Sequence, residues 1–229
     1  MKNFYILLIV MFMVNCAGGQ DSILALQTSR QRSLIQIYDS IYYWDWDTIS
    51  IEWRIDRKII DMVYDDNNNL INLISQTWND SAWENFDQYT YTYDANNNRT
   101  SFLYQTWDNR AWINDYQHIF TYNANNYLTT ELFQNWDGST WLNDYQFIYT
   151  YDAINNTTSY LRQNWNGSTW VNIYQYLYAY DVNNNRTNGL YQTWNGSAWV
   201  NSIQFSYTYD ANNNLTSELR QHWIERLEK

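Results

Sequence analysis

The chain has 229 residues, of which 45% are hydrophobic and 20% aromatic, and it contains no proline. This composition supports a sizeable folded core and excludes collagen-like and proline/glycine-rich disordered chains. With 13 basic against 24 acidic residues, the formal net charge is −11, which argues against a nucleic-acid partner because phosphate binding requires a basic surface.

Residues 1–19 carry the pattern of an export signal. Lys2 provides a positive start, and the unbroken apolar run from Phe4 to Val14 has the length of a signal-peptide core, too short for a membrane span. The sequence therefore predicts a protein that is secreted or lies on the outer cell surface. No later apolar stretch is long enough to cross a bilayer, so we expect no transmembrane segment.

The cleavage site has two interpretations. Val14 and Ala17 satisfy the small-residue rule of an ordinary signal peptidase, whereas the residues before Cys16 loosely resemble a bacterial lipobox, which would place a lipid anchor on Cys16. Cys16 is the only cysteine, so the sequence of the body offers no disulfide, no thiolate nucleophile and no cysteine-based metal site.

Residues 20–63 are predicted to form a degenerate first unit. The stretch Asp39–Asp47, followed by Trp53, has the composition of the later repeats but not their spacing. Terminal repeats of an array commonly diverge because they cover an open edge, so we expect a capping unit here.

Residues 64–223 form a repeat array with a period of 29 residues. Its Tyr-Asp-Ala-Asn-Asn-Asn type segments begin at Tyr64, Tyr93, Tyr122, Tyr151, Tyr180 and Tyr209. Two tryptophan columns keep the same step, at Trp78, Trp107, Trp136, Trp165, Trp194 and Trp223 and at Trp83, Trp112, Trp141, Trp170 and Trp199. The array breaks off midway through a unit, as a truncated array would, and a tail at 224–229 follows.

Within each unit the residue pattern has a period of two, which predicts β-strands. Each unit is expected to contain a strand of eleven residues, an Asn-rich turn, a shorter strand and a second turn. Strict alternation places tryptophans and tyrosines on one face, as in Trp199, Asn201, Ile203, Phe205, Tyr207 and Tyr209. The predicted fold is an all-β antiparallel meander of six β-hairpin repeats, forming a curled or spiral, solenoid-like sheet.

Both turns have suitable chemistry. Asn166-Gly167 and its equivalents accept positive φ in a hairpin, and a four-residue loop would place Trp165 directly opposite Trp170. The other turn, as in Asp94–Asn98, uses asparagine where glycine is common, because asparagine also tolerates the left-handed region.

The segment Tyr207–Thr216 resembles the Tyr-Asp core of the YD/RHS repeat family, whose pattern is Tyr-x-Tyr-Asp-x-x-Gly-x-Leu-Thr. The alternation of Asp-Ala-Asn-Asn-Asn and Trp-Asn-Gly-Ser-x-Trp also resembles repeat proteins exported by Bacteroidetes. The resemblance covers residues 60–223, but this chain has asparagine where the family has glycine, lacks its usual arginine and uses a longer period. In family members with long arrays, such hairpins wind into a hollow β-shell.

The paired tryptophans are the candidate binding residues. A sheet face with this many aromatic side chains is either buried by curling of the sheet or covered by a ligand. In the first case the aromatics are core, and in the second they are stacking platforms for the sugar rings of a polysaccharide. The candidate platforms are Trp107, Trp112, Trp136, Trp141, Trp165, Trp170, Trp194 and Trp199.

Two polar patterns also have structural and functional interpretations. The glutamine columns that contain Gln163 and Gln175 would form an amide ladder or bind sugar hydroxyls. The Asp-x-Asn-x-Asn spacing matches the start of a calcium loop but lacks its glycine and its bidentate acid, so an Asx-type turn is favoured. The calcium candidates are Asp94, Asn96, Asn98, Asp210, Asn212 and Asn214, and no other cofactor is expected.

The sequence shows no nucleophile elbow, phosphate loop or metal cluster, and His118 and His222 occur singly, so we expect a protein that is not an enzyme. The leading hypothesis is a secreted or surface binding module whose partner is a polysaccharide or a surface protein. The alternative is a structural spacer, an adhesin stalk or a shell fragment of a larger YD-type protein. The sequence leaves the ligand and the oligomeric state open.

Overall fold

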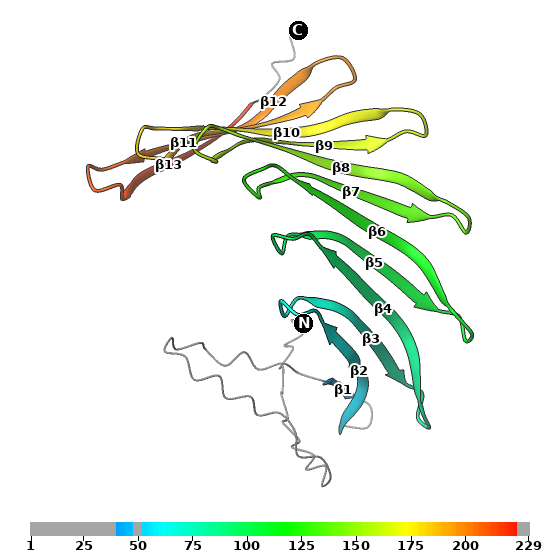
Figure 1. Cartoon of the computed structure of the whole chain (residues 1–229). Coiled ribbons are helices and arrows are strands. Elements are labelled where there is room, and N and C mark those ends of the chain that lie inside the picture. The colour runs from blue at the N-terminus through cyan, green and yellow to red at the C-terminus, as the bar shows by residue number, and fades with distance from the viewer. Residues whose placement is uncertain (1–39, 48–51, 224–229) are drawn as a thin grey trace. The chain divides into compact units, whose positions relative to one another are not determined.

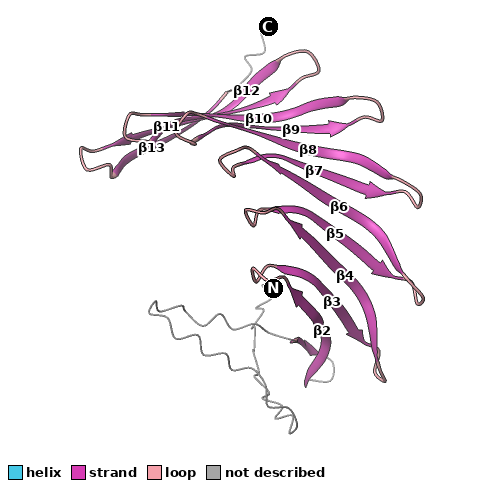
Figure 2. Cartoon of the chain, viewed as in Figure 1, coloured by secondary structure: helices cyan, strands magenta, loops and turns pink. Residues whose placement is uncertain are grey.

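The computed structural model of the chain describes residues 40–47 and 52–223 (Figure 1). The predicted signal peptide, Cys16 and the tail at 224–229 lie outside these residues. Every regular element of the described part is a β-strand, as Figure 2 shows. The same residues contain no helix that is long and apolar enough to span a membrane.

Thirteen strands follow one another in the sheet in chain order, which confirms the predicted all-β meander. The strands are β1 (Ile41–Asp47), β2 (Glu52–Tyr64), β3 (Leu70–Trp78), β4 (Trp83–Tyr93), β5 (Arg99–Trp107), β6 (Trp112–Tyr122), β7 (Leu128–Trp136), β8 (Trp141–Tyr151), β9 (Thr157–Trp165), β10 (Trp170–Tyr180), β11 (Arg186–Trp194), β12 (Trp199–Tyr209) and β13 (Leu215–His222). Strands of 11 residues alternate with strands of 9 residues from β4 to β12, as the period of the array predicts.

The chain divides into two compact units. The first contains the described residues up to Gln88 together with 107–111, and the second contains 89–106 and the described residues from Trp112 onward. In the first unit, β1 pairs antiparallel with β2, with Ile41 opposite Ile59, so the predicted capping segment contains strands. In the second unit, the strands from β6 to β13 pair in succession, each antiparallel to the next.

Strand β10 contains a β-bulge that the alternation pattern does not predict. Asn172 lies opposite Gln163 and Tyr174 lies opposite Arg162, so Ile173 is an extra residue with no counterpart in β9. Successive side chains of a strand point to opposite faces, and an extra residue therefore reverses the alternation beyond it. The even-numbered residues of β10 therefore point to one face before the bulge, as Asn172 does, and to the opposite face after it, as Tyr174 does.

The bulges place the tryptophans and the tyrosines on opposite faces of the sheet. Equivalent register shifts occur in β8 at 143–145 and in β12 at 201–203. The tryptophan face of the second unit carries Trp136, Trp141, Trp165, Trp170, Trp194 and Trp199. The tyrosine face carries Phe133, Tyr145, Phe147, Tyr149, Tyr160, Tyr174, Tyr176, Tyr178, Tyr191, Phe205 and Tyr207. The expectation of one shared aromatic face is therefore wrong.

The turns have the backbone conformations that the sequence predicts. In the Asn-rich turns of the second unit, φ lies between 63° and 70° at Asn97, Asn126, Asn155, Asn184 and Asn213. In the other turns, φ lies between 96° and 98° at Gly138, Gly167 and Gly196. Asparagine occupies the left-handed region where the family pattern has glycine, because its short amide tolerates that region better than other side chains do.

The described residues contain little fully buried apolar surface. Phe120 falls to 9% exposure, whereas most aromatic side chains of β5–β12 are half-buried. Aromatic rings instead contact one another across neighbouring strands, as Tyr160 and Tyr176 do with ring centroids 4.9 Å apart. Lateral contacts of this kind between cross-strand neighbours stabilise a sheet.

Candidate functional site

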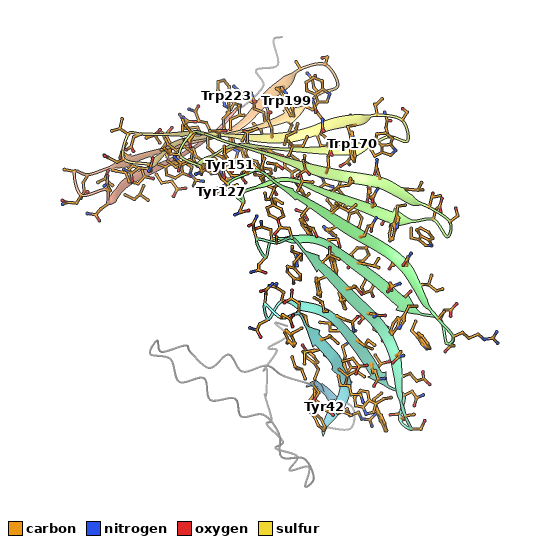
Figure 3. All side chains as sticks on the ribbon, in the orientation of Figure 1. Tyr42, Tyr127, Tyr151, Trp170, Trp199 and Trp223 are labelled. Carbon is orange, nitrogen blue, oxygen red and sulfur yellow. The ribbon has the colours of Figure 1, made fainter. Side chains whose placement is uncertain are left out.

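Cross-strand tryptophan pairs lie at one end of the hairpins. Trp165 ends β9 and Trp170 begins β10, and the two residues lie directly opposite each other, as the four-residue loop predicts. Figure 3 labels Trp170 and Trp199 beside these hairpin ends. The ring centroids of the pairs are 5.4 Å apart for Trp78/Trp83, 5.0 Å for Trp136/Trp141, 5.1 Å for Trp165/Trp170 and 5.2 Å for Trp194/Trp199.

The pairs of the second unit have similar geometry. Their ring planes meet at 60° to 66°, the edge-to-face arrangement that the ring quadrupole favours. Each of these tryptophans is half-buried, so part of every ring is accessible to a ligand. The remaining two candidates, Trp107 at the end of β5 and Trp112 at the start of β6, are half-buried as well.

A row of side-chain amides lies next to the tryptophan pairs on the same face. Gln146 donates through Nε2 to Oε1 of Gln163 at 2.7 Å, and Gln163 donates through Nε2 to Oδ1 of Asn172 at 2.7 Å. The same relay connects Gln117, Gln134 and Asn143, and again Gln175, Gln192 and Asn201. The predicted amide ladder is confirmed, with asparagine as an additional member that sequence analysis missed.

Hydrogen bonds within each loop fix the distance between the paired tryptophans. Oδ1 of Asn166 accepts hydrogen bonds from N–H of Ser168, from N–H of Thr169 and from Oγ of Ser168. The backbone N–H of Asn166 donates to the carbonyl of Thr169 at 3.2 Å. With Gly167 at positive φ, the loop closes tightly and places Trp165 beside Trp170.

The tyrosine face is half-buried and is hydrogen-bonded to the backbone. Burial raises the pKa of Tyr149 to about 12, and it also raises the pKa of Tyr178. The hydroxyl of Tyr180 donates to the carbonyl of Thr157 at 2.9 Å, and the equivalent bond recurs at Tyr122, Tyr151 and Tyr209. These contacts connect neighbouring strands, so the tyrosines of the Tyr-Asp segments have a structural role.

Several charged side chains on the tyrosine face lie against aromatic rings. The guanidinium of Arg162 lies 4.7 Å from the ring centroid of Tyr145, and that of Arg186 lies 4.9 Å from Tyr207. His118 Nδ1 lies 2.8 Å from Glu131 Oε1. The arginines recur at two positions of the repeat, Arg162 with Arg220 and Arg99 with Arg186, and sequence analysis missed this signal because it followed only the columns present in every unit.

The Asn-rich turns use their carboxylates internally. Oδ1 of Asp94 accepts from the N–H groups of Asn96 and Asn98, and Oδ2 accepts from Nδ2 of Asn98 at 3.0 Å. The hydrogen bonds from the side chain and backbone of Asn98 hold the pKa of Asp94 below its ordinary value. Asn98 therefore presents a nitrogen to the carboxylate, which is the geometry of an Asx-type turn.

The second calcium candidate has the same arrangement. Asp210 accepts from the N–H groups of Asn212 and Asn214 and from Nδ2 of Asn214 at 2.9 Å. Neighbouring turns also contact each other, since Nδ2 of Asn185 donates to Oδ1 of Asn213 at 2.8 Å. The amides of these turns thus connect one hairpin to the next.

No protein-family model matches the sequence, and no curated protein matches it significantly. Among solved structures, the chain is similar to a DUF3836 family protein from Bacteroides vulgatus, with 22% identity over 37% of this chain and 90% of that one and a TM-score of 0.31. It is also similar to a protein of unknown function from Bacteroides fragilis, with 13% identity over 64% of this chain and 89% of that one and a TM-score of 0.29. A third similarity, to TcdB2-TccC3, has 11% identity over 80% of this chain but 13% of that one, with a TM-score of 0.37. These likenesses are too distant to carry an argument about function.

Proposed function

We propose that the protein is an exported, non-enzymatic binding module whose tryptophan face holds a polysaccharide. The observation that carries this proposal is the shared position of two chemistries on one face. Tryptophan rings offer flat apolar surface, and the amides of Gln163 and Asn172 lie on the same face two residues away along β9 and β10. A sugar ring needs both kinds of contact, because it has apolar C–H faces and a rim of hydroxyl groups.

The amide row retains hydrogen-bonding capacity for a ligand. Each side-chain amide has two N–H donors and a carbonyl with two lone pairs. In the relay, Gln163 uses one donor toward Asn172 and one acceptor position toward Gln146. The remaining positions are suited to sugar hydroxyls, which both donate and accept.

The repetition of the site favours a polymer over a single sugar. Each tryptophan pair spans two strands, so successive pairs follow at intervals of about 9.5 Å across a sheet with ordinary strand spacing. One chain of a repeating polysaccharide would contact several pairs, and its affinity would exceed that of a single contact by multivalency. The export signal that the sequence predicts in 1–19 agrees with a partner outside the cell.

One observation favours a structural spacer as a second candidate. The amides already bond to one another, and the Asn-rich turns connect neighbouring hairpins, which are the properties of a self-supporting array. The resemblance to YD/RHS repeats agrees with such a scaffold or shell role. In this case the tryptophan pairs only close the hairpins.

A depletion assay distinguishes the two functions. The purified protein is mixed with a panel of insoluble and soluble polysaccharides, and unbound protein and tryptophan emission are measured. Replacement of both Trp165 and Trp170 by alanine should weaken retention roughly tenfold, equivalent to about 1.4 kcal/mol. The matched control is Tyr176→Phe, which changes the opposite face of the same strand and should leave retention unchanged.

The unfolding midpoint of each variant is measured in parallel. If no polysaccharide depletes the protein and its emission is already blue-shifted when free, the binding hypothesis is wrong and the array is a scaffold. Retention that survives the double replacement would place the ligand away from the tryptophan face.

A further inference from the structure

Strand β13 is an exposed edge in the described part of the chain. All eight of its residues, Leu215–His222, are exposed, whereas β11, the preceding short strand, is largely half-buried. The exposed fractions of Leu215 and Leu219 are 53% and 51%. None of the described strands pairs with the outer side of β13, and an edge with apolar side chains is a template for another strand, because its outward N–H and C=O groups are able to pair.

The direction of those backbone groups follows from the pairing with β12. The N–H of Trp223 donates to the carbonyl of Ser202 at 2.9 Å, and His222 lies opposite Ile203. In an antiparallel pair, alternate residues turn their N–H and C=O groups to opposite sides. Leu219 therefore directs its backbone groups toward β12, and Glu218 and Arg220 direct theirs toward the open edge.

The sequence of this edge is complementary to itself. Glu218 and Arg220 flank Leu219, so an antiparallel copy centred on Leu219 brings each acid opposite a base. Leu219 lies opposite Ser206 on the tryptophan face, whereas Glu218 lies opposite Tyr207 on the tyrosine face. Arg220 is on the tyrosine face as well, with its guanidinium 5.6 Å from the ring centroid of Phe205.

We propose that two copies of this chain associate by antiparallel pairing of their β13 strands about Leu219. Glu218 then faces Arg220 of the partner subunit, and the two-fold axis repeats this charge pair on its other side. Leu219 packs against Leu219 of the partner subunit. The outward N–H and C=O groups of Glu218 and Arg220 form four main-chain hydrogen bonds across the two-fold axis.

Charge argues for a second copy over an unrelated acidic or basic strand. The chain has a net charge of −11, so two copies repel each other unless the contact itself contains opposite charges. The Glu-Leu-Arg order supplies two opposite-charge pairs only in the symmetric register. The contact is small, so we expect a dimer that dissociates on dilution and at high salt.

Charge reversal tests the register. Glu218→Arg and Arg220→Glu each place like charges opposite one another in both pairs, so either variant should weaken dimerisation by about tenfold or more. The double variant Glu218→Arg/Arg220→Glu restores opposite charges and should regain the dimer. An equimolar mixture of the two single variants should also form a heterodimer, because one edge is then doubly basic and the other doubly acidic.

Sedimentation velocity over a concentration series measures the association of the full chain, and circular dichroism verifies that each variant is folded. Wild-type protein that stays monomeric at every concentration overturns the proposal. Single variants that dimerise as well as wild type, or a mixture that does not associate, also overturn it, since another strand or another segment would then occupy the edge.

Disulfide trapping gives an independent measurement. In a Cys16→Ser background, Leu219→Cys should form a covalent dimer under mild oxidation, because facing residues of this pair type have adjacent Cβ atoms. The control is Ser217→Cys, which lies on the same face but would face Gln221 of the partner subunit. Equal trapping at 217 and 219 would refute the register centred on Leu219.

Discussion

The hydroxyl of Tyr180 tests the role of the Tyr-Asp segments. It donates to the carbonyl of Thr157 at 2.9 Å and thereby connects β10 to the start of β9. Tyr180→Phe removes this donor and leaves the ring in place. A neutral hydrogen bond contributes about 1 kcal/mol to stability, and the carbonyl left behind is only partly buried, so water can replace part of the loss. We expect a decrease of about 1 kcal/mol in the free energy of unfolding.

The matched control is Tyr178→Phe. Tyr178 lies two residues earlier on the same face of β10, and its hydroxyl makes no hydrogen bond to the described side chains or backbone. Removal of this hydroxyl should therefore leave the free energy of unfolding unchanged or slightly higher. The comparison separates loss of the hydrogen bond from the small change in ring polarity that both variants share.

The repeat allows the loss of stability to be measured at two equivalent hydrogen bonds at once. Tyr151 and Tyr209 make the same bond in β8 and β12, at 2.7 Å and 3.0 Å. These strands are four positions apart in the sheet, about 19 Å, so the two losses should add to about 2 kcal/mol.

Urea unfolding followed by tryptophan emission measures these differences, with the slope m serving to verify that the transition is unchanged. Two results would refute the reasoning. One is a loss for Tyr178→Phe equal to that for Tyr180→Phe. The other is no loss for the Tyr151→Phe/Tyr209→Phe double variant.

Two further predictions concern the hairpin loop and the effect of pH. Gly167→Ala should destabilise the protein by about 1 kcal/mol in a thermal melt, because φ at this position is 96°. The loss is limited to backbone strain, since no neighbouring atom crowds the new Cβ. Gly167→Asn should destabilise the protein less, since Asn109 occupies the equivalent place at φ 73°. Burial raises the pKa of Tyr149 to about 12 and raises that of Tyr160 as well, so the stability these tyrosines contribute is complete below about pH 10 and is lost as the pH rises through 12. Asp94, whose pKa is lowered, contributes stability above about pH 4 that is lost in stronger acid. Urea midpoints across this pH range check both signs, and a midpoint that rises above pH 10 would contradict the first.

The parts of the fold that depend on local chemistry were predictable from sequence. The Trp165/Trp170 pair follows from the length of its loop, and positive φ at Asn184 follows from the tolerance of asparagine for that region. Side-chain distances were not predictable, but the residue types of the amide row and its regular spacing indicated the ladder.

The separation of the faces was not predicted, because a β-bulge has no signature in a period-two pattern. Trp170, Asn172 and Tyr174 follow one another at intervals of two residues, and alternation alone assigns them to one face. The extra residue at Ile173 becomes visible only when β10 is aligned with β9. Their unequal lengths, 11 and 9 residues, were the available signal, since a longer strand opposite a shorter one must overhang or bulge.

The position of the bulges inside each hairpin has a consequence for the evolution of the array. The bulge near Asn172 and the register shift between Ala179 and Tyr180 both lie within a single 29-residue unit. Unequal recombination that adds or removes a whole unit therefore preserves the chemistry of both faces in all the remaining hairpins. An insertion of one codon within a strand instead moves tyrosines into the tryptophan row. Recombination can thus change the number of units freely, whereas selection keeps the spacing within a unit constant. This accounts for six units without a single insertion or deletion.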